Sequence, residues 1–287
     1  MKFKSPALRK SFISRGFVNA LAALAMAATL VAQTEEVETE KKEEIPAEAK
    51  KPVVVLSQNR EQLELPGIKV QIKERYVDVD ATVCLTAGLL ELVVCAKDTK
   101  EHESVIAIDA KAAHIHASLL LLGIKPGNPA MRKVIEGENA EDGRWIDLPP
   151  RGPKVDVFLV VKDEAGKPVE RPISDFLMKD HDRYEVKLEG QEEAGTERFP
   201  TNTFLFAGSH VYRGGEGPPK YLADVDGNVI SISTFGNELL CLPGVYTQGN
   251  EGLVWEVDST HLPELGEKVI LRLRPQAQDA PPAEKKD

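Results

Sequence analysis

The sequence is poor in cysteine and in basic side chains, and each shortage excludes a class of function. Its three cysteines form no CxxC motif and no zinc-finger spacing, and three cysteines cannot supply the four thiolates of an iron–sulfur cluster. Lysine and arginine total 36 against 46 acidic residues, so the net charge is −10. An acidic balance argues against nucleic acid and against anionic lipid as partners. We therefore expect no iron–sulfur cluster and no nucleic-acid partner.

The N-terminus has the pattern of a secretory signal peptide. Five basic residues precede an apolar, alanine-rich segment at residues 17–31, which is shorter than the ~18 apolar residues of a spanning helix. We predict a signal peptide over residues 1–32 with cleavage near Ala32, and therefore a periplasmic or secreted location. The alternative is an uncleaved N-terminal anchor, which would be the only contact with a membrane.

Composition divides the rest of the chain into three parts. Residues 33–52 are charged and lack aromatic side chains, so they predict a disordered linker. Residues 276–287, rich in Ala, Pro, Lys and Asp, predict a disordered tail. The intervening residues 53–275 are expected to form one domain. A proline-rich stretch at 149–153 marks an alternative division into two subdomains.

Alternating apolar and polar residues predict a sheet. Residues Tyr76–Leu85 alternate with period two, and Lys154–Lys162 form a second strong strand pattern. Residues Leu89–Ala96 are nearly all apolar, which also allows a helix, but the preceding Gly88 and the valines favour a strand that pairs with Tyr76–Leu85. Residues Tyr221–Val225 and Asn228–Ser233 predict a hairpin across an Asp-Gly turn.

One helix is expected at residues 110–122. Asp109 is suited to cap its first turn and Gly123 to follow its last. The turn Leu119–Leu122 is apolar all round, which is typical of a helix buried on several sides. We therefore predict an α+β fold, with a mostly antiparallel β-sheet and a central buried helix at about 110–122.

The pairing of Cys84, Cys95 and Cys241 stays open at this level. An exported protein meets oxidising conditions, so one disulfide plus one free thiol is one interpretation. Three buried thiols that act as small apolar side chains are the other. If Cys84 and Cys95 lie on strands joined by a tight turn, they are several residues out of register, which argues against a bond between them.

The polar cluster His102-Glu103-Ser104 is the first candidate for catalysis. On a strand, His102 and Ser104 would share a face, and a histidine beside a serine can activate its hydroxyl. A complete triad also needs an orienting acid and an oxyanion hole, and no G-x-S-x-G motif presents the serine. The alternative is a polar strand entry whose side chains bond to local backbone groups.

The two histidines His114 and His116 are candidate binding residues. On a helix they point to opposite sides, because residues two apart are ~200° apart, so they cannot share one metal ion. Either could join His102, and His102 with His114 is the weak candidate pair for a metal. The alternative is a pair of histidines at the edge of the core that bond to their neighbours.

The stretch TKEHESVIAIDAKAAHIHASLLLLGIKPGNPA, residues 99–130, carries a resemblance. With the strands before it, this stretch resembles the YdjY-like family of bacterial exported proteins. The resemblance covers about Gly67–Asn128 and continues more weakly through RWIDLPP, FPTNTFLFAGSHVY and YLADVDGNVISIS. It implies an exported α+β domain and no established activity. Ferredoxin-type labels attached to some members are not transferred, because this chain lacks the cysteines.

Two classes of function follow from the sequence. The favoured one is a non-enzymatic binding or interaction domain of the periplasm or cell envelope, whose partner is an envelope protein or a small ligand. The alternative is a hydrolase or a metal-dependent enzyme built on His102, Glu103 and Ser104 with a helix histidine. A non-enzymatic domain is favoured because no complete catalytic set is present.

Overall fold

The computed structural model describes residues 55–56, 61–134, 145–180, 196–215, 217–246 and 253–277. The chain divides into two units, Met1–Ala49 and Lys50–Asp287, and every described residue belongs to the second. The expected signal peptide, the segment 33–52 and residues 278–287 of the expected tail lie outside the described residues. Within the described ranges, no helix is both long enough and apolar enough to span a membrane.

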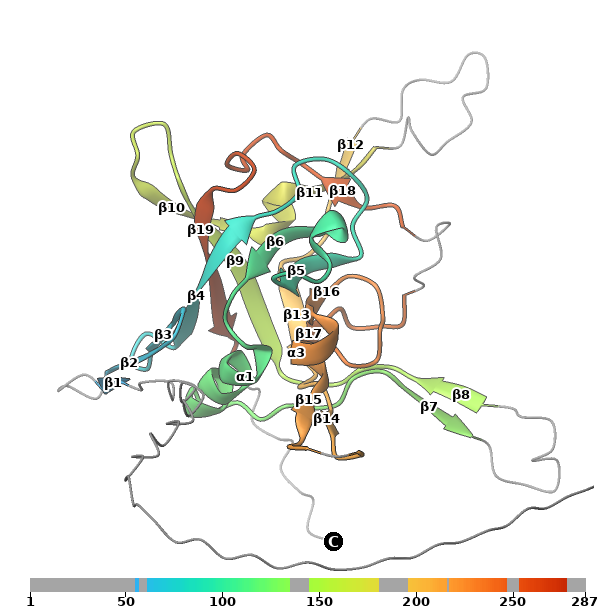
Figure 1. The fold of residues 1–287 in the computed structure, drawn as a ribbon. Coiled ribbons are helices and arrows are strands. Elements are labelled where there is room, and N and C mark those ends of the chain that lie inside the picture. The colour runs from blue at the N-terminus through green and yellow to red at the C-terminus, as the bar shows by residue number, and fades with distance from the viewer. Residues whose placement is uncertain are drawn as a thin grey trace, which may run out of the picture. The chain divides into compact units, whose positions relative to one another are not determined.

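The described residues are mostly β-strands (Figure 1). The α-helices among them are α1 (Ala112–Leu121) and α3 (Leu222–Asp226), and the 3₁₀ turns are η1 (Glu101–Glu103) and η3 (Ile173–Phe176). The strands are β1 (Val55–Leu56), β2 (Gln62–Leu65), β3 (Ile68–Gln71), β4 (Tyr76–Val83), β5 (Leu92–Ala96), β6 (Ser104–Ile108), β7 (Met131–Val134), β8 (Trp145–Leu148), β9 (Lys154–Lys162), β10 (Pro168–Pro172), β11 (Leu177–Asp180), β12 (Thr196–Arg198), β13 (Thr203–Phe206), β14 (Val211–Tyr212), β15 (Lys220–Tyr221), β16 (Asn228–Ser231), β17 (Leu240–Cys241), β18 (Glu256–Val257) and β19 (Lys268–Pro275).

Eight of these strands close into a barrel. Their order is β4-β19-β9-β13-β17-β16-β5-β6, and the pairing of β6 with β4 completes the ring. The pairs β5–β6 and β16–β17 are parallel, and the other pairs are antiparallel. Strands β3, β2 and β1 extend the sheet beyond β4, while β10 pairs with β9. Closure leaves no free edge within the ring.

The barrel interior is the hydrophobic core. Every second residue of β4, β9 and β19 is buried, as the period-two pattern of these segments requires. The largest fully buried side chains include Phe204 and Phe206 of β13 and Leu159 of β9. The strand predicted at Lys154–Lys162 is confirmed at those bounds.

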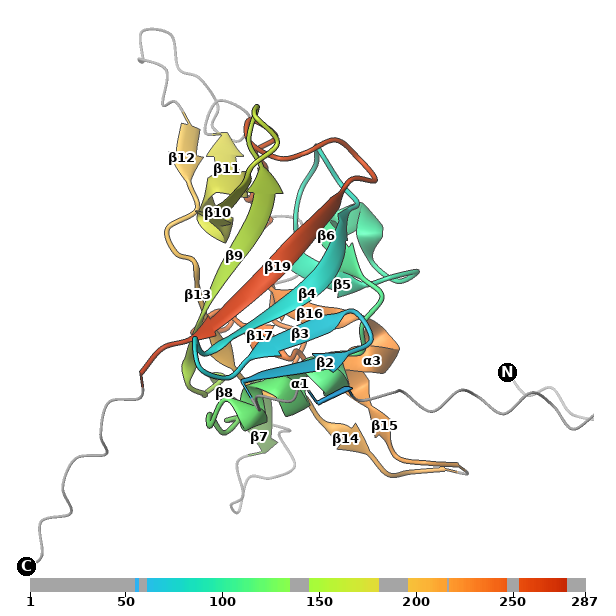
Figure 2. The ribbon, with the colours of Figure 1, turned by 90° about the vertical axis from the view of Figure 1, so that its left-hand side faces the viewer.

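The predicted α+β class with a central buried helix at 110–122 is wrong. Helix α1 lies at one end of the barrel (Figures 1 and 2), and the core is formed by strands. Leu119 is fully buried, but Leu120 and Leu121 are 45% and 54% exposed. Four consecutive leucines predict burial on all sides, yet a helix packed on one side buries only part of each turn.

The ends of α1 differ from the prediction at the first turn and agree at the last. Asp109 does not cap the helix, and instead its carboxylate lies 3.0 Å from Lys97 Nζ. The N–H of Ala113 donates to Asp224 Oδ1, at 3.3 Å, from α3. Gly123 has φ +84° and its N–H donates to Leu120 O, so the glycine predicted to follow the helix is confirmed.

Two strand pairings predicted from the sequence are also wrong. Strand β5 pairs with β6 and β16 and not with β4, because β6 lies between β4 and β5 in the ring. The expected hairpin across Asp226-Gly227 is the end of helix α3. Gly227 has φ +79° and donates its N–H to Ala223 O. An Asp-Gly pair suits both a tight hairpin and a helix end, since both need a left-handed residue.

The outer face of β4, β19 and β10 carries a network of charged side chains centred on Arg272. Its guanidinium bonds to both carboxylate oxygens of Asp78, at 2.6 and 2.7 Å, and to Glu170 at 2.7 Å. Arg274 also bonds to Glu170, and both guanidinium groups lie over the ring of Tyr76. The guanidinium groups of Arg274 and Arg272 lower the pKa of the Glu170 carboxyl.

We expect Arg272→Met to lower the free energy of unfolding by about 2 kcal/mol at pH 7, because it removes both hydrogen bonds to the partly buried Asp78 carboxylate and one of those to Glu170. A carboxyl with a lowered pKa stabilises the fold above its ordinary pKa of 4.5, and that contribution is lost as the pH falls. The cost should therefore shrink at pH 3. Urea unfolding at both pH values measures it, with Lys268→Met on the same strand as control. An equal cost at both pH values would contradict this account.

Candidate functional site

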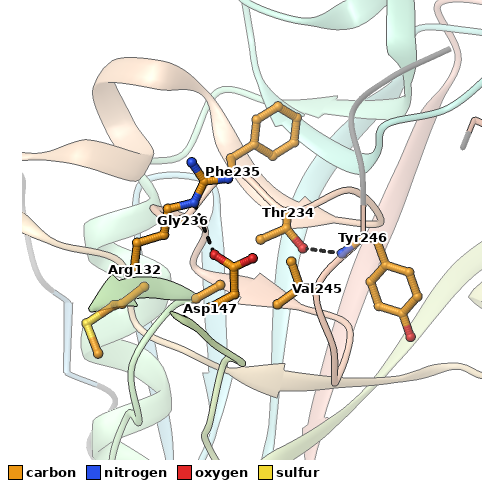
Figure 3. Close-up of a pocket in the computed structure, with 9 residues that line it drawn as sticks. Arg132, Asp147, Thr234, Phe235, Gly236, Val245 and Tyr246 are labelled. Atoms are coloured by element: carbon orange, nitrogen blue, oxygen red, sulfur yellow. Dashed lines mark hydrogen bonds and ion pairs between the residues drawn. The ribbon is translucent and has the colours of Figure 1, made fainter. Parts of the chain in front are cut away.

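A cavity of about 650 Å³ opens beside the hairpin of β7 and β8 (Figure 3). We call this cavity the slot. It is formed by four separate parts of the chain: the start of β7, strand β8, the loop after β16 and the loop after β17. Its lining residues are Ala130, Met131, Arg132, Asp147, Thr234, Phe235, Gly236, Val245 and Tyr246.

The wall formed by the hairpin is held by a cross-strand ion pair. Arg132 and Asp147 are opposite each other in the antiparallel register, and Arg132 Nε lies 3.1 Å from Asp147 Oδ1. The guanidinium of Arg132 is also 5.2 Å from the ring centre of Trp145. Opposite charges at directly paired positions stabilise a hairpin and fix its register.

The opposite wall is fixed by backbone contacts and one buried carboxylate. Thr234 and Tyr246 are joined by Tyr246 N to Thr234 Oγ1 at 2.8 Å and Thr234 N to Tyr246 O at 3.1 Å. The fully buried Glu238 accepts the N–H groups of Phe235 and, at 3.0 Å, Gly236. This wall is therefore preformed, as ligand sites usually are.

Large apolar side chains stand exposed around the slot. Met131, Val245 and Tyr246 line the slot, whereas Trp145 and Ile146 precede Asp147 on β8. Each of these five side chains is between 41% and 55% exposed. Scattered exposed apolar residues are ordinary, but a group of them around one cavity is typical of an interaction site. Tyrosine, tryptophan, methionine and arginine are also the residue types enriched at protein interfaces.

Behind Phe235 lies a second group, which we call the acid cluster: Glu91, Lys100, His102 and Glu103. Lys100 Nζ is 3.7 Å from the ring centre of Phe235 and 3.5 Å from Glu103 Oε1. His102 Nε2 is 3.7 Å from Glu103 Oε2. Burial, followed by the neighbouring Glu103 carboxylate, raises the pKa of Glu91. The acid cluster thus contains two neighbouring carboxyl groups, and the one with the raised pKa is that of Glu91.

The structure brings His102 and Glu103 together but does not present Ser104. The Ser104 side chain is fully buried, and its hydroxyl donates to Lys100 O at 2.7 Å. The His102 side chain is 76% exposed, on the turn η1 that precedes Ser104. The hydroxyl is therefore used in closing a local turn and is not open to a substrate.

The helix histidines His114 and His116 contact other residues than those of the acid cluster. His116 Nδ1 is 2.8 Å from Tyr221 OH, which donates to Gly208 O, and burial lowers the pKa of His116. His114 offers its backbone carbonyl to the Ser118 hydroxyl. Among the described residues, no group of three or more His, Cys, Asp or Glu side chains is arranged to hold a metal ion.

The three cysteines are free thiols in the structure. Cys84 Sγ donates to Ser104 O at 3.1 Å, and the thiols of Cys84 and Cys95 hydrogen-bond to each other. That contact raises the pKa of Cys84 and lowers the pKa of Cys95. Burial raises the pKa of the Cys241 thiol. Strand β6 lies between β4, which ends at the residue before Cys84, and β5, which carries Cys95.

The raised pKa of Glu91 makes a prediction about stability. A carboxyl with a raised pKa destabilises the fold when it ionises, so its cost is absent below the ordinary value of 4.5 and grows as the pH rises above it. We expect Glu91→Gln to be more stable than wild type at pH 7 by less than ~1 kcal/mol and equal to it at pH 4. Thermal unfolding at both pH values measures the difference.

Glu164→Gln, in the exposed turn between β9 and β10, is the control for this comparison. It should leave the difference between the two pH values unchanged. A Glu91→Gln protein that is less stable than wild type at pH 7 would show that the Glu91 carboxylate makes a net favourable contact, contrary to this prediction.

Sequence reasoning found part of the acid cluster and missed the slot. His102 and Glu103 are adjacent in the chain, whereas Glu91 is a single acid in the apolar run LLELVVCA, and that isolation is the one signal that could have identified it. The slot residues come from four segments between Ala130 and Tyr246 and share no motif. Only the folded chain brings them together.

Comparison with known proteins gives a family and no function. The model of the YdjY domain matches residues 68–274, which include seven of the eight barrel strands in full and β19 as far as Arg274. No curated protein matches the chain, and no solved structure does. The match covers well over half of the sequence and includes the acid cluster and the slot. The chain therefore belongs to the YdjY domain family.

Proposed function

We propose that this protein is a non-enzymatic binding domain that acts outside the cytoplasm and holds its ligand in the slot. The observation that carries this proposal is the set of exposed apolar and aromatic side chains around a preformed cavity. A volume of about 650 Å³ lies within the ~300–1,000 Å³ range of ligand sites. Binding needs only this complementarity, whereas catalysis would also need a reactive group in the slot.

Export is part of the proposal and rests on the sequence. The basic residues and the apolar segment of residues 1–32 support a cleaved signal peptide and a periplasmic or secreted location. The charged segment 33–52 would then be the N-terminal part of the mature chain, ahead of the barrel domain.

A second cavity, of about 1,200 Å³, lies beside the turn between β9 and β10. It is larger than the slot, but its lining is dominated by charged and polar side chains such as Lys162, Asp163, His261 and Glu264. A surface of this kind is ordinary solvated surface. We therefore place the ligand in the slot.

Fragment screening by protein-observed NMR tests this assignment without knowledge of the natural ligand. We expect fragments to collect at the slot, because preformed cavities that combine aromatic walls with a few polar groups bind small molecules readily. Trp145→Ala and Tyr246→Ala should abolish these contacts. Tyr212→Ala is the matched control, since Tyr212 and Trp145 are 54% and 55% exposed. The ring centre of Trp145 lies 5.2 Å from the guanidinium of Arg132, which lines the slot, whereas Tyr212 is not one of the lining residues. Fragments that collect at the second cavity instead would contradict the proposal.

The second candidate is an enzyme that uses the acid cluster. It is favoured by the raised pKa of Glu91 beside Glu103, because two neighbouring carboxyl groups with different pKa values are suited to the roles of general acid and general base. Glu103 would act as the base and His102 would bind substrate. Ser104 has no role as a nucleophile in this version. A panel of chromogenic glycosides, esters and phosphates tests it, and turnover that is lost in Glu103→Gln would replace the binding proposal.

A further inference from the structure

The slot contains one positive and one negative side chain, whose charges cancel. Arg132 and Asp147 form its ion pair, and among the residues that the structure describes no other ionisable side chain lines it except Tyr246. A bound anion would meet Asp147, and a bound cation would meet Arg132. Either ligand would have to compete with the existing partner. The slot is therefore suited to a neutral ligand.

With respect to the described residues, the ion pair keeps most of its hydrogen-bonding capacity. Arg132 engages Asp147 through Nε alone, and both side chains are about half exposed or more. The guanidinium group has five N–H donors in all, and a carboxylate has two acceptor oxygens. An apolar ligand would bury these groups without partners, which costs free energy for each one. A ligand in this slot should therefore carry groups that both donate and accept.

The aromatic rings supply the other half of the recognition. Phe235 and Tyr246 line the slot (Figure 3). The ring centre of Trp145 lies 5.2 Å from the guanidinium of Arg132, and Lys100 Nζ lies 3.7 Å from the ring centre of Phe235. The face of an aromatic ring is electron-rich, so it attracts polarised C–H groups. A sugar ring has such C–H faces and a periphery of hydroxyl groups, each of which is both donor and acceptor.

We propose that the slot binds a neutral saccharide, with a sugar ring against Phe235 or Tyr246 and adjacent hydroxyl groups bonded to Arg132 and Asp147. This inference rests on the proposed function, and it adds the chemical class of the ligand. Binding comes from stacking and hydrogen bonds and not from net charge, so the affinity should change little between low and high salt.

Isothermal titration calorimetry with the full-length protein tests the proposal. The neutral probes are the hexasaccharides of the cellulose, chitin and maltose series. The comparison probes are hexagalacturonate, which is anionic, a chitosan hexamer, which is cationic, and an apolar hexapeptide. We expect at least one neutral hexasaccharide to bind, and the charged and apolar probes not to bind. Asp147→Asn and Tyr246→Ala should each weaken binding at least about tenfold, or ~1.4 kcal/mol.

Two controls show whether a variant binds less tightly because it lacks a contact with the ligand or because it is unfolded. Tyr212→Ala should bind as wild type does, and circular dichroism should show that each variant is folded. If the charged or apolar probes bind at the slot and the neutral sugars do not, the saccharide inference is wrong and the slot remains a binding site. If no probe binds and fragments also avoid the slot, both the inference and the proposed function are wrong.

Discussion

Replacing Gly152 with alanine should destabilise the fold by about 3 kcal/mol or more. A methyl group at this position would lie 2.1 Å from the carbonyl oxygen of Phe206 and 2.6 Å from its carbonyl carbon. Both obstacles are backbone atoms of β13, which is part of the closed ring, so neither can rotate away. Phe206 is also fully buried, so moving its backbone disturbs the core.

The clash reaches further because three chain segments cross at this point. Phe206 O accepts the N–H of Gly127, and a methyl group on Gly127 would lie 1.9 Å from Arg151 O. Asn128 and Arg151 exchange two backbone hydrogen bonds of 2.9 Å, just below the hairpin of β7 and β8. The crossing thus anchors one wall of the slot to the barrel. We expect Gly152→Ala to weaken ligand binding as well as stability.

Gly166→Ala is the control that separates the steric clash expected at Gly152 from the general cost of replacing a glycine with alanine. Gly166 has φ +76° and open space around its Cα, so alanine there should cost only the ~1 kcal/mol of a left-handed residue. Gly152 does not need a left-handed backbone. Urea unfolding of both variants at pH 7 therefore separates the two explanations. A steric clash predicts the larger loss of stability for Gly152→Ala, and a need for a left-handed backbone predicts the larger loss for Gly166→Ala. A greater loss for Gly166→Ala would show that the crossing relaxes easily.

The sequence predicts the strands of this barrel better than their partners. Period-two alternation identifies Lys154–Lys162 and most of Tyr76–Leu85, because one face of each strand is buried. The alternation of apolar and polar residues does not indicate which strands pair with one another in the sheet. The pairing of β6 with β4, which closes the ring, joins residues such as Val83 and Ile106, and nothing in the local pattern marks it. An open sheet covered by a helix therefore looked equally consistent.

The candidate site shows the same limit. Adjacent residues such as His102 and Glu103 can be proposed from the sequence, because one turn carries both. Phe235 joins the slot to the acid cluster, yet it lies more than a hundred residues from Lys100. Ser104 shows the opposite error. Its neighbours in sequence suggest a nucleophile, but a local hydrogen bond to Lys100 O occupies the hydroxyl.

Leu119→Ala should lower the free energy of unfolding by ~2–5 kcal/mol, although α1 is not central to the fold. Leu119 is fully buried and belongs to the same hydrophobic core as the barrel strands. Helix α1 contacts β3, β4 and α3, so its buried side joins the strand extension to the rest of the core. Removing three carbon atoms there leaves a cavity that a closed ring of strands cannot collapse to fill.

Leu120→Ala is the matched control, one residue along the same helix. Leu120 is 45% exposed, so its truncation should cost less than ~1 kcal/mol. Both substitutions raise the helix propensity equally, which leaves burial as the difference between them. Equal losses would show that the burial of Leu119 is not the source of its effect, which would contradict this prediction. A loss confined to Leu119→Ala would show that a helix at the end of a barrel can stabilise it through one side, without being surrounded.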